Sequence, residues 1–403
     1  MTHTLLLDLD DTLLDTNMEN FIPAYFLALS ETLQDLVSPE IMIPALMGGT
    51  KKMMEKNDPE KTLSEVFDEY FYSKIGIDRV ELKLKIDGFY DDVFPKLKYL
   101  TKQRPDSIEF VKQSFEKNYR VVIATNPLFP LKAIQHRLRW AGLAPEDFPY
   151  KLITSYETSH FTKENITYFS EILGKLGWLD ESVIMVGNDI KMDIEPAMES
   201  GLPVYWVTEE IIHSHEHSEI PQGKIKDIHA WLEGVSNRTL QHSIESTSSL
   251  LAVLRSTPAV LEGNLSSITE AEYDSHSNNQ EWSIKEVICH LRDIEIDVNI
   301  PRIQRILSQD NSFIAEEITD HWAKERNYAG QDCKNALFSF IRARKVTLEL
   351  LGELNAEWDS SVRHSIFGSI SLRELVGITA GHDKNHVRQV HNNLAQQQIT
   401  VPD

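Results

Sequence analysis

The chain has 403 residues, too many for one ordinary core, so we expect two or more domains. Its net charge is −22, and both the first 235 residues and the remainder are acidic, which argues against the basic surface that a nucleic-acid backbone requires. No segment approaches the roughly 18 apolar residues that span a bilayer. The two cysteines, Cys289 and Cys333, do not indicate a disulfide framework. We therefore expect a cytoplasmic protein with no membrane or nucleic-acid partner.

Four short apolar runs predict buried strands, and three of them end directly in polar residues. The runs are Thr4–Leu7, Val121–Ala124, Val183–Val186 and Leu202–Val207. Asp8 follows the first run, Thr125 follows the second, and Gly187-Asn188-Asp189 follows the third. Helical patterns separate the runs, and this alternation is typical of a Rossmann-like, doubly wound parallel sheet of the α/β class. Ligands bind such sheets beyond the carboxyl ends of the strands, where these polar residues stand.

Residues 16–95 form a helical insert between the first strand and the rest of the predicted sheet. Its expected helices are Met18–Leu33, Pro39–Met54 and Thr62–Lys74. An insert in this position is a natural lid over the site. We therefore predict a helical cap within a first domain that covers residues 1–235.

Residues 236–242 are polar and predict a linker, after which the strand–helix alternation stops. Helical patterns follow near 243–256, 283–308, 331–353 and 371–396. Ser283 with Glu286, and Ser371 with Glu374, fit the capping box that opens a helix. We predict that residues 243–403 form an all-α four-helix bundle.

Asp8 and Asp10 are the candidate catalytic pair. Residues i and i+2 of a strand face the same side, so both carboxylates can share one site. A divalent cation relieves their repulsion, and oxygen ligands favour Mg²⁺. One carboxylate can then attack phosphorus while the other protonates the leaving oxygen. A solvated acidic turn is the alternative interpretation of this segment alone.

Further candidate catalytic and metal-binding residues lie at or after the ends of the later strands. Thr125 can hold a phosphoryl oxygen, with Asn126 beside it as a supporting residue, and Lys163 can neutralise charge on the transferring group. Asp189 and Asp193 can complete metal coordination and hold the lysine. Each has an ordinary explanation alone, but together they indicate one site.

These residues resemble the haloacid-dehalogenase-like hydrolase superfamily across residues 1–235. The resemblance implies a Rossmann-like core, an aspartyl-phosphate intermediate on Asp8, Mg²⁺ and a cap that sets substrate choice. The family often has a carboxylate directly after the glycine of the fourth motif, where this chain has Asn188. We expect Asp189 to be the Mg²⁺ ligand with Asp8 and Asp10, and keep Asn188 as the alternative.

The presence of Asp10 distinguishes between reactions within this family. Its true dehalogenases lack a carboxylate at this position, so the resemblance implies a phosphatase of small phosphorylated metabolites. A phosphomutase would need the same residues and stays open as an alternative.

Three histidines of the second half form a candidate metal site. His382 and His386 are four residues apart and lie on one helix face, and His290 lies on the apolar face of an earlier helix. Three inward imidazoles can bind Zn²⁺, Ni²⁺ or Fe²⁺, with Glu295 or Asp293 as a neighbouring carboxylate. Buried histidines satisfied by hydrogen bonds are the alternative. The cluster of His213, His215 and His217, by contrast, suggests only a solvated loop.

Residues 243–403 resemble the DinB/YfiT-like four-helix domain, on Glu281-Trp282-Ser283, Cys289-His290-Leu291 and the run His382–Gln389. The resemblance implies a three-histidine metal site. Some members are thiol-dependent transferases, so a metal-dependent thiol S-transferase in the bundle is an alternative main activity. A homodimer through the bundle is a candidate assembly.

Overall fold

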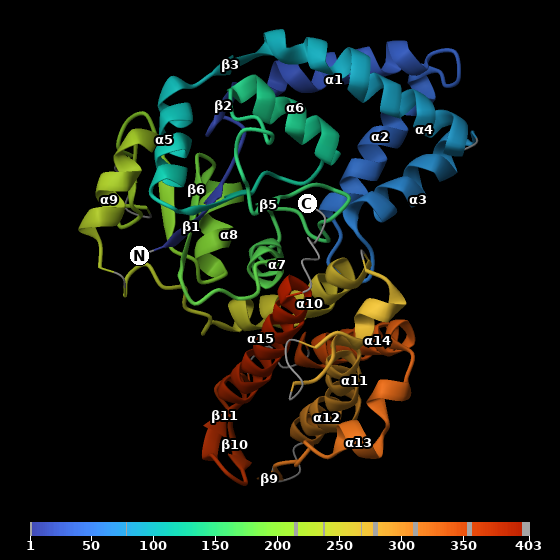
Figure 1. Cartoon of the computed structure of the whole chain (residues 1–403), viewed down its shortest axis with the longest axis vertical. Helices are drawn as coiled ribbons and strands as arrows, with labels where there is room; N and C mark the ends of the chain where they lie inside the picture. Colours follow the sequence, from blue (N-terminus) through green and yellow to red (C-terminus); the bar gives the residue numbers. More distant parts are fainter. Residues whose placement is uncertain are drawn as a thin grey trace.

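The computed structural model describes residues 2–77, 79–212, 217–236, 238–266, 268–276, 281–308, 313–352 and 357–396. His213 and His215 lie outside these residues. The chain forms a helix-flanked sheet with a helical cap above it and a mainly helical second part below (Figure 1). The expected fold class is therefore confirmed.

The central sheet is parallel and has the strand order β5-β4-β1-β6-β7-β8. The strands are β1 (His3–Leu7), β4 (Arg120–Ile123), β5 (Leu152–Ile153), β6 (Ser182–Gly187), β7 (Val204–Val207) and β8 (Gln222–Gly223). Strands β4 and β5 lie on one side of β1, and β6, β7 and β8 lie on the other. The carboxyl ends of β1, β4 and β6 therefore meet where the strand order reverses, at a switch point of the topology. The short strands β5 and β8 were not predicted, because two residues carry no periodic pattern.

Helices cover both faces of the sheet. They are α5 (Pro105–Glu116), α6 (Leu131–Ala141), α7 (Thr167–Lys175), α8 (Glu195–Glu199) and α9 (Ile228–Gly234). Leu5 and Leu7 of β1 pack with α5, α6 and α9, whereas Leu6 faces α7 and α8 on the other side. This alternation is the two-residue period of a strand that is buried on both faces.

The cap follows β1 through the short strand β2 (Leu14–Thr16) and returns through β3 (Thr101–Gln103), which pairs with β2 in antiparallel fashion. Its helices are α1 (Met18–Leu33), α2 (Pro39–Met54), α3 (Leu63–Ile75) and α4 (Arg79–Gly88), followed by a π-helical turn (Phe89–Val93) and a 3₁₀ helix (Phe94–Leu100). The first two match the predicted bounds. Thr62 is the N-cap of α3 and forms a capping box with Glu65. Helix α4 was not predicted.

The second part is built on four long helical segments. They are α10 (Thr247–Ser266), α11 (Ile284–Ile294) continued through a π-helical turn (Glu295–Asn299) into α12 (Ile300–Leu307), α14 (Cys333–Gly352) and α15 (Leu372–Gln396). Short elements join them: 3₁₀ turns at Glu270–Asp274 and Tyr328–Gly330, helix α13 (Trp322–Glu325), and strands β9 (Phe313–Ile314), β10 (Ser361–His364) and β11 (Gly368–Ser371). Helix α10 runs ten residues beyond its expected end, and the small sheet was not foreseen.

The two parts share one apolar core. Helix α10 packs along α7, and the buried cluster that contains Leu6 continues through Val260 into the bundle. A Cβ at Gly174 of α7 would press on Val260 of α10, so the two helices approach closely at a glycine. The bundle is therefore a third layer on one face of the sheet rather than a body on a flexible tether.

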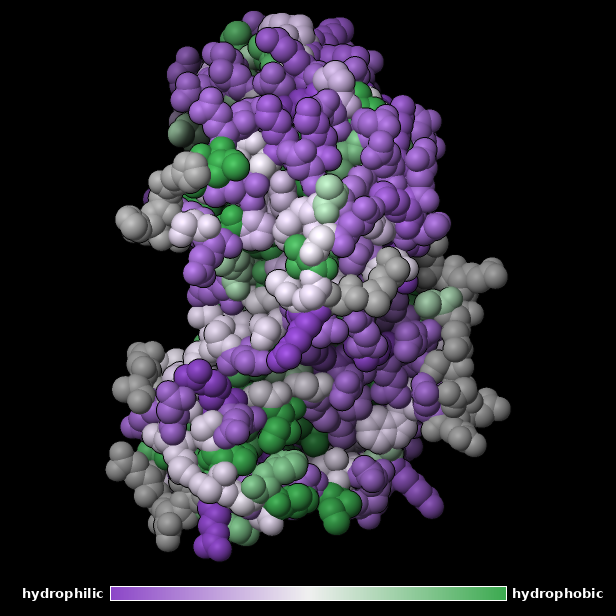
Figure 2. All heavy atoms as spheres, turned by 90° about the vertical axis from the view of Figure 1, so that its left-hand side faces the viewer, coloured by the Kyte–Doolittle hydropathy of each residue, from purple (hydrophilic) through white to green (hydrophobic). Residues whose placement is uncertain are grey.

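The surface is mostly hydrophilic on the face seen in Figure 2, with apolar side chains gathered toward the lower end. Strands β9–β11 lie at that end in Figure 1, and Phe313, Ile366 and Phe367 are exposed. Within the described ranges, none of the helices combines the length and the apolar character needed to cross a bilayer.

Candidate active site and metal centre

The segment after β1 turns sharply and presents two carboxylates. Asp11 has a left-handed backbone (φ 57°), and its carboxylate accepts a hydrogen bond from the Thr16 backbone at 2.8 Å. Asp and Asn tolerate this conformation better than most side chains. Ser107 of α5 donates to the Thr12 carbonyl at 3.0 Å and holds the turn from behind. Asp8 is therefore fixed at the strand end, and Asp10 stands on the first turn after it.

Lys163 brings the ends of two strands together. Its ammonium donates to Asp8 Oδ1 at 2.5 Å and to Asp193 Oδ1 at 2.6 Å, and all three residues are buried. Burial alone lowers the pKa of Lys163, but the Asp193 and Asp8 carboxylates outweigh it and raise the pKa above its ordinary value. Lys163 is therefore a permanent cation beside the candidate nucleophile.

Asp193 is held by the geometry of the fourth motif. Its second carboxylate oxygen accepts the backbone N–H of Asp189 at 3.0 Å, and a Cβ at Gly187 would collide with this carboxylate. Burial first, and the Asp8 charge second, raise the pKa of Asp193 to about 7, while Lys163 opposes the rise. The structure thus places Asp193 where it orients Lys163.

Thr125 and Asn126 follow β4 as expected. Thr125 is buried, and its carbonyl accepts hydrogen bonds from Thr154 and from the Tyr168 hydroxyl, both at 2.8 Å. Asn126 Oδ1 accepts the backbone N–H of Lys163 at 3.3 Å. Both residues therefore border the Asp8–Lys163 pair on a fixed backbone.

Asp189 and Asn188, the two candidate Mg²⁺ ligands after β6, make different contacts. Asp189 is exposed, and its carboxylate caps the following π-helical segment (Ile190–Ile194) by accepting the backbone N–H groups of Lys191 and Met192. Asn188 Oδ1 instead accepts the Thr12 hydroxyl at 2.9 Å and so lies against the segment that carries Asp10. Of the two candidate Mg²⁺ ligands, Asn188 is therefore the one whose side chain faces the segment that carries Asp10.

Arg137 is a site residue that the sequence analysis missed. It projects from α6, is 1% exposed, and its guanidinium pairs with the Asp10 carboxylate. The same group stacks against the rings of Phe21 and Phe129, each 5.4 Å from the ring centroid. Burial lowers the pKa of Arg137 to about 10, so the group remains charged at neutral pH.

The charge balance of this cluster leaves room for a cation. When all three are ionised, the carboxylates of Asp8, Asp10 and Asp193 face two cations, Lys163 and Arg137, which leaves one negative charge in excess. The oxygens of Asp8, Asp10 and Asn188 are hard donors of the kind that Mg²⁺ prefers. The donor set therefore fits magnesium.

A cavity of about 560 Å³ lies between the cap and the core. Its lining is dominated by apolar and aromatic side chains, among them Tyr25, Phe67, Phe71, Tyr90 and Phe129. Phe129 also packs on the Arg137 guanidinium that pairs with Asp10, so this ring links the cavity wall to the carboxylate site.

The three predicted histidines of the bundle converge. Nε2 of His382 lies 3.1 Å from Nε2 of His290 and 3.2 Å from Nε2 of His386. One ring nitrogen from each residue falls within 4.8 Å of the others. The Trp282 ring covers the group, with its centroid 4.6 Å from that of His290. Tertiary packing thus joins α11 and α15 at one point.

Protonation and hydrogen bonding also suit a metal at this point. Burial is the largest cause that lowers the pKa of His290 to about 2 and those of His382 and His386 to about 4. All three imidazoles are therefore neutral ligands at pH 7. His386 Nδ1 bonds to Gln389 at 3.1 Å, and the buried Nδ1 of His290 has no partner among the described residues. The donor set fits Zn²⁺, Ni²⁺ or Fe²⁺.

The two carboxylates expected near the histidines, Glu295 and Asp293, have other hydrogen-bond partners in the structure. Glu295 pairs with Arg344 at 2.8 Å, and Asp293 accepts from Arg326 and Tyr328. Arg344 is fully buried and also pairs with Asp383, which follows His382 but lies on another face of α15. This buried ionic network packs the bundle beneath the histidines rather than orienting their rings.

Models of two protein families match the two parts of the chain. Residues 2–201 match the haloacid dehalogenase-like hydrolases, and residues 254–390 match the DinB superfamily. The expectation of a hydrolase is thereby confirmed.

Individual relatives resemble one half each. A protein of Oceanobacillus iheyensis, named as a candidate metal-dependent hydrolase, is 23% identical over 145 residues, which are 33% of this chain and 77% of the relative. YfiT from Bacillus subtilis, an unusual four-helix bundle, has 18% identity and a TM-score of 0.36, covering 39% of this chain and 91% of its own. A phosphatase of this superfamily from Thermococcus onnurineus has 14% identity and a TM-score of 0.37, covering 58% and 99%.

Proposed function

We propose that the first part of the chain is a Mg²⁺-dependent phosphatase that hydrolyses phosphate monoesters through an aspartyl-phosphate on Asp8. The observation that carries this proposal is the Asp8–Lys163–Asp193 chain of contacts at the ends of β1 and β6. A buried ammonium held against one carboxylate is suited to bind the negative phosphoryl group that this carboxylate attacks. Asp10, two residues on, supplies the second carboxyl group that phosphoryl transfer needs.

The steps follow from the placement of these side chains. A carboxylate oxygen of Asp8 attacks phosphorus, the bond to the ester oxygen breaks, and Asp10 gives its proton to the departing alcohol. Asp10 then takes a proton from a water molecule that attacks the acyl phosphate, which releases phosphate and restores Asp8. Lys163 and Thr125 hold phosphoryl oxygens, and Arg137 fixes Asp10 between the two steps. Magnesium, held by Asp8, Asp10 and Asn188, would offset the negative charge of the phosphoryl group.

The cap cavity favours an alcohol with a sizeable apolar or aromatic part. Its walls are rich in rings, and the hydroxyls of Tyr25 and Tyr90 bond to each other at 2.9 Å, which uses one of their two protons. Charged side chains such as Arg79, Lys83 and Lys132 also line it. A small phosphorylated metabolite with a ring or branched chain fits this lining better than a polyhydroxylated sugar.

The proposal is tested by an assay of the full chain with a panel of phosphate monoesters, with Mg²⁺ and with chelator. We expect hydrolysis only with the cation. The value of kcat/KM for 2-phenylethyl phosphate should exceed that for ethyl phosphate by about tenfold or more, because burying a phenyl group contributes roughly 1.5–3 kcal/mol. Equal values for the two esters would contradict the assignment of the cavity, and transfer of phosphate between positions of one substrate would indicate a phosphomutase.

The fourth motif provides a prediction of its own. Asn188→Ala should raise the Mg²⁺ concentration at half-maximal rate by about tenfold or more, because it removes an oxygen ligand. Asp189→Ala should change this concentration by about twofold or less and lower the melting temperature slightly, because it removes a helix cap. Magnesium titrations of the two variants check this, and the reverse order would return the ligand to Asp189.

A second activity in the bundle is supported by the convergence of His290, His382 and His386. Three neutral imidazoles leave a coordination position open, and a metal there would activate a bound water or thiol. We propose that the bundle binds one divalent transition metal, with thiol S-transfer as its candidate reaction. Metal-dependent consumption of a low-molecular-weight thiol together with an electrophile would distinguish this reaction from hydrolysis.

A further inference from the structure

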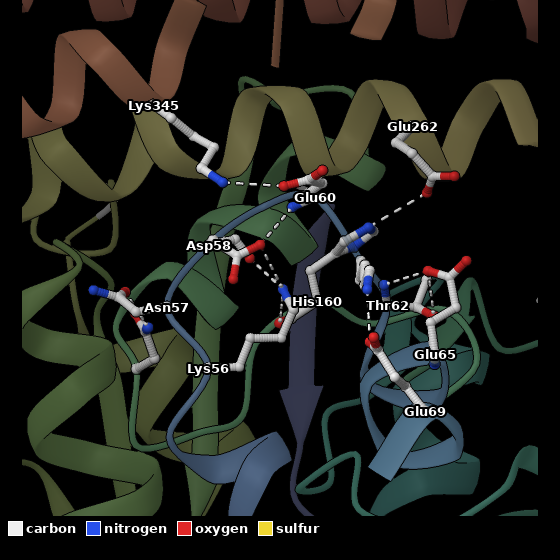
Figure 3. A network of polar contacts seen from close by, with 12 residues as sticks. Lys56, Asn57, Asp58, Glu60, Thr62, Glu65, Glu69, His160, Glu262 and Lys345 are labelled. Carbon is white, nitrogen blue, oxygen red and sulfur yellow. Dashed lines mark hydrogen bonds and ion pairs between the residues drawn. The ribbon is translucent and has the colours of Figure 1, made fainter. Parts of the chain in front are cut away.

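Three parts of the chain meet in one polar junction (Figure 3). They are the cap segment 55–62 between α2 and α3, the core segment 154–163 between β5 and α7, and helices α10 and α14 of the bundle. The core segment ends at Lys163, which contacts Asp8. Whatever holds this segment therefore bears on the proposed phosphatase site.

His160 is the centre of the junction. It is fully buried, and its Nδ1 lies 2.8 Å from Oε1 of Glu171 in α7 while its Nε2 lies 3.3 Å from Oε2 of Glu262 in α10. The same Glu171 carboxylate accepts the backbone N–H of His160 at 3.1 Å and pairs with Lys175. The imidazole thus bridges a carboxylate of the hydrolase part and a carboxylate of the bundle.

The charged groups around His160 explain its protonation. Burial lowers its pKa, but Glu171 and then Glu262 outweigh burial and raise the pKa above the ordinary histidine value, while Lys175 opposes them. Two acids facing one imidazole from opposite sides favour the cation. Across the interface between the two parts, the buried His160 and the partly exposed Glu262 therefore form an ion pair.

The cap is attached to the same place. Lys56 is buried, and its ammonium donates to the His160 carbonyl at 3.3 Å; the Leu63 backbone N–H donates to the Ser159 carbonyl at 2.8 Å. Lys345 of α14 reaches Glu60 of the cap segment at 3.0 Å, a pair that is well exposed and weak by itself. The segment that carries Lys163 is thus held by the cap and by the bundle together.

We propose that Glu262 is a positioning residue of the phosphatase, acting through His160 to hold the segment 154–163 and hence Lys163 against Asp8. The inference rests on the proposed function of the first part. It assigns the fused bundle a role in phosphate hydrolysis, in addition to any metal chemistry of its own. A small displacement of Lys163 would weaken its contact with the phosphoryl group, so the effect belongs to turnover and not only to stability.

The test compares variants of the full chain. Glu262→Gln keeps the shape and removes the charge, and we expect kcat/KM to fall by about tenfold. Glu270→Gln neutralises an exposed acid of the same part of the chain and should leave kcat/KM within about twofold. The alkaline limb of the pH–rate profile should also move to lower pH in Glu262→Gln, because His160 loses one of its two acids.

A double-mutant cycle separates positioning from general damage. His160→Asn keeps a donor for Glu171 but has no atom that reaches Glu262, so adding Glu262→Gln to it should change kcat/KM by less than about twofold. Glu262→Asp, with its charge kept, should be intermediate and serves if Glu262→Gln does not fold. Wild-type activity in folded Glu262→Gln, or additive losses in the cycle, would overturn the inference. A wild-type chain that hydrolyses no phosphate monoester would overturn the proposed function itself.

Discussion

Asp8→Asn should lower the phosphatase kcat by about 10⁴-fold or more, because an amide cannot form the acyl phosphate on which the reaction depends. The fold should survive, since asparagine occupies the same volume and can still accept the hydrogen bond from Lys163. The loss of one carboxylate beside Lys163 should even lower the electrostatic cost of the cluster at neutral pH. Steady-state rates with a saturating ester, together with circular dichroism, check both parts of this expectation.

The matched control for this variant is Asp15→Asn. Asp15 belongs to the same acidic stretch but lies exposed in β2, so its kcat should stay within about twofold of the wild-type value. A residual rate above about a hundredth of wild type in Asp8→Asn would rule out a covalent intermediate on this residue.

His382→Ala should remove the metal from the bundle. Its Nε2 is the central atom of the three, within 3.2 Å of both others, so the two remaining imidazoles would form an incomplete site. The wild-type chain purified without chelator should hold about one equivalent of transition metal, and the variant close to none. The melting temperature should fall as well, because a ligand that binds only the folded state stabilises it.

His321→Ala is the control for the metal measurement, since His321 is an exposed histidine of the same part of the chain. Elemental analysis of both variants and of the wild type gives the comparison. Full occupancy in the combined His290→Ala, His382→Ala, His386→Ala variant would show that the three residues are core histidines and nothing more.

The pattern of the sequence predicted the strand ends well, because Asp8 and Thr125 directly follow, or nearly follow, a buried apolar run. Asp8, Thr125 and Lys163 lie where the doubly wound sheet requires them, and the bounds of α1 and α2 agree with their periodicity. Local physics governs these features: strands end where burial ends, and helices begin at a capping residue.

Arg137 was missed because an arginine within an amphipathic helix is normally assigned to the solvent side. A signal was nevertheless present. Arg137 follows Ala133 and Ile134 and precedes Ala141 at spacings of three and four residues, so it stands on the apolar stripe of α6. A charge on that stripe indicates a buried partner, which here is Asp10.

The contact between the two parts could not be read from the sequence at all. Helix α7 is buried on every side from Thr167 to Gly174, because the sheet covers one face and α10 covers the other. Its Glu171 looks like a solvated residue until His160 and Lys175 are placed beside it. Such packing between segments far apart in the chain has no local signature.

The central claim is the covalent intermediate on Asp8, and the most direct measurement is the site of phosphorylation after an acid quench. The full chain, mixed with Mg²⁺ and a phosphate ester that it hydrolyses, should carry one phosphoryl group on the peptide that contains Asp8. The group should be released by hydroxylamine, as an acyl phosphate is, and should be absent in Asp8→Asn. A phosphoryl group on any other residue, or turnover without a labelled peptide in rapidly quenched samples, would contradict the account.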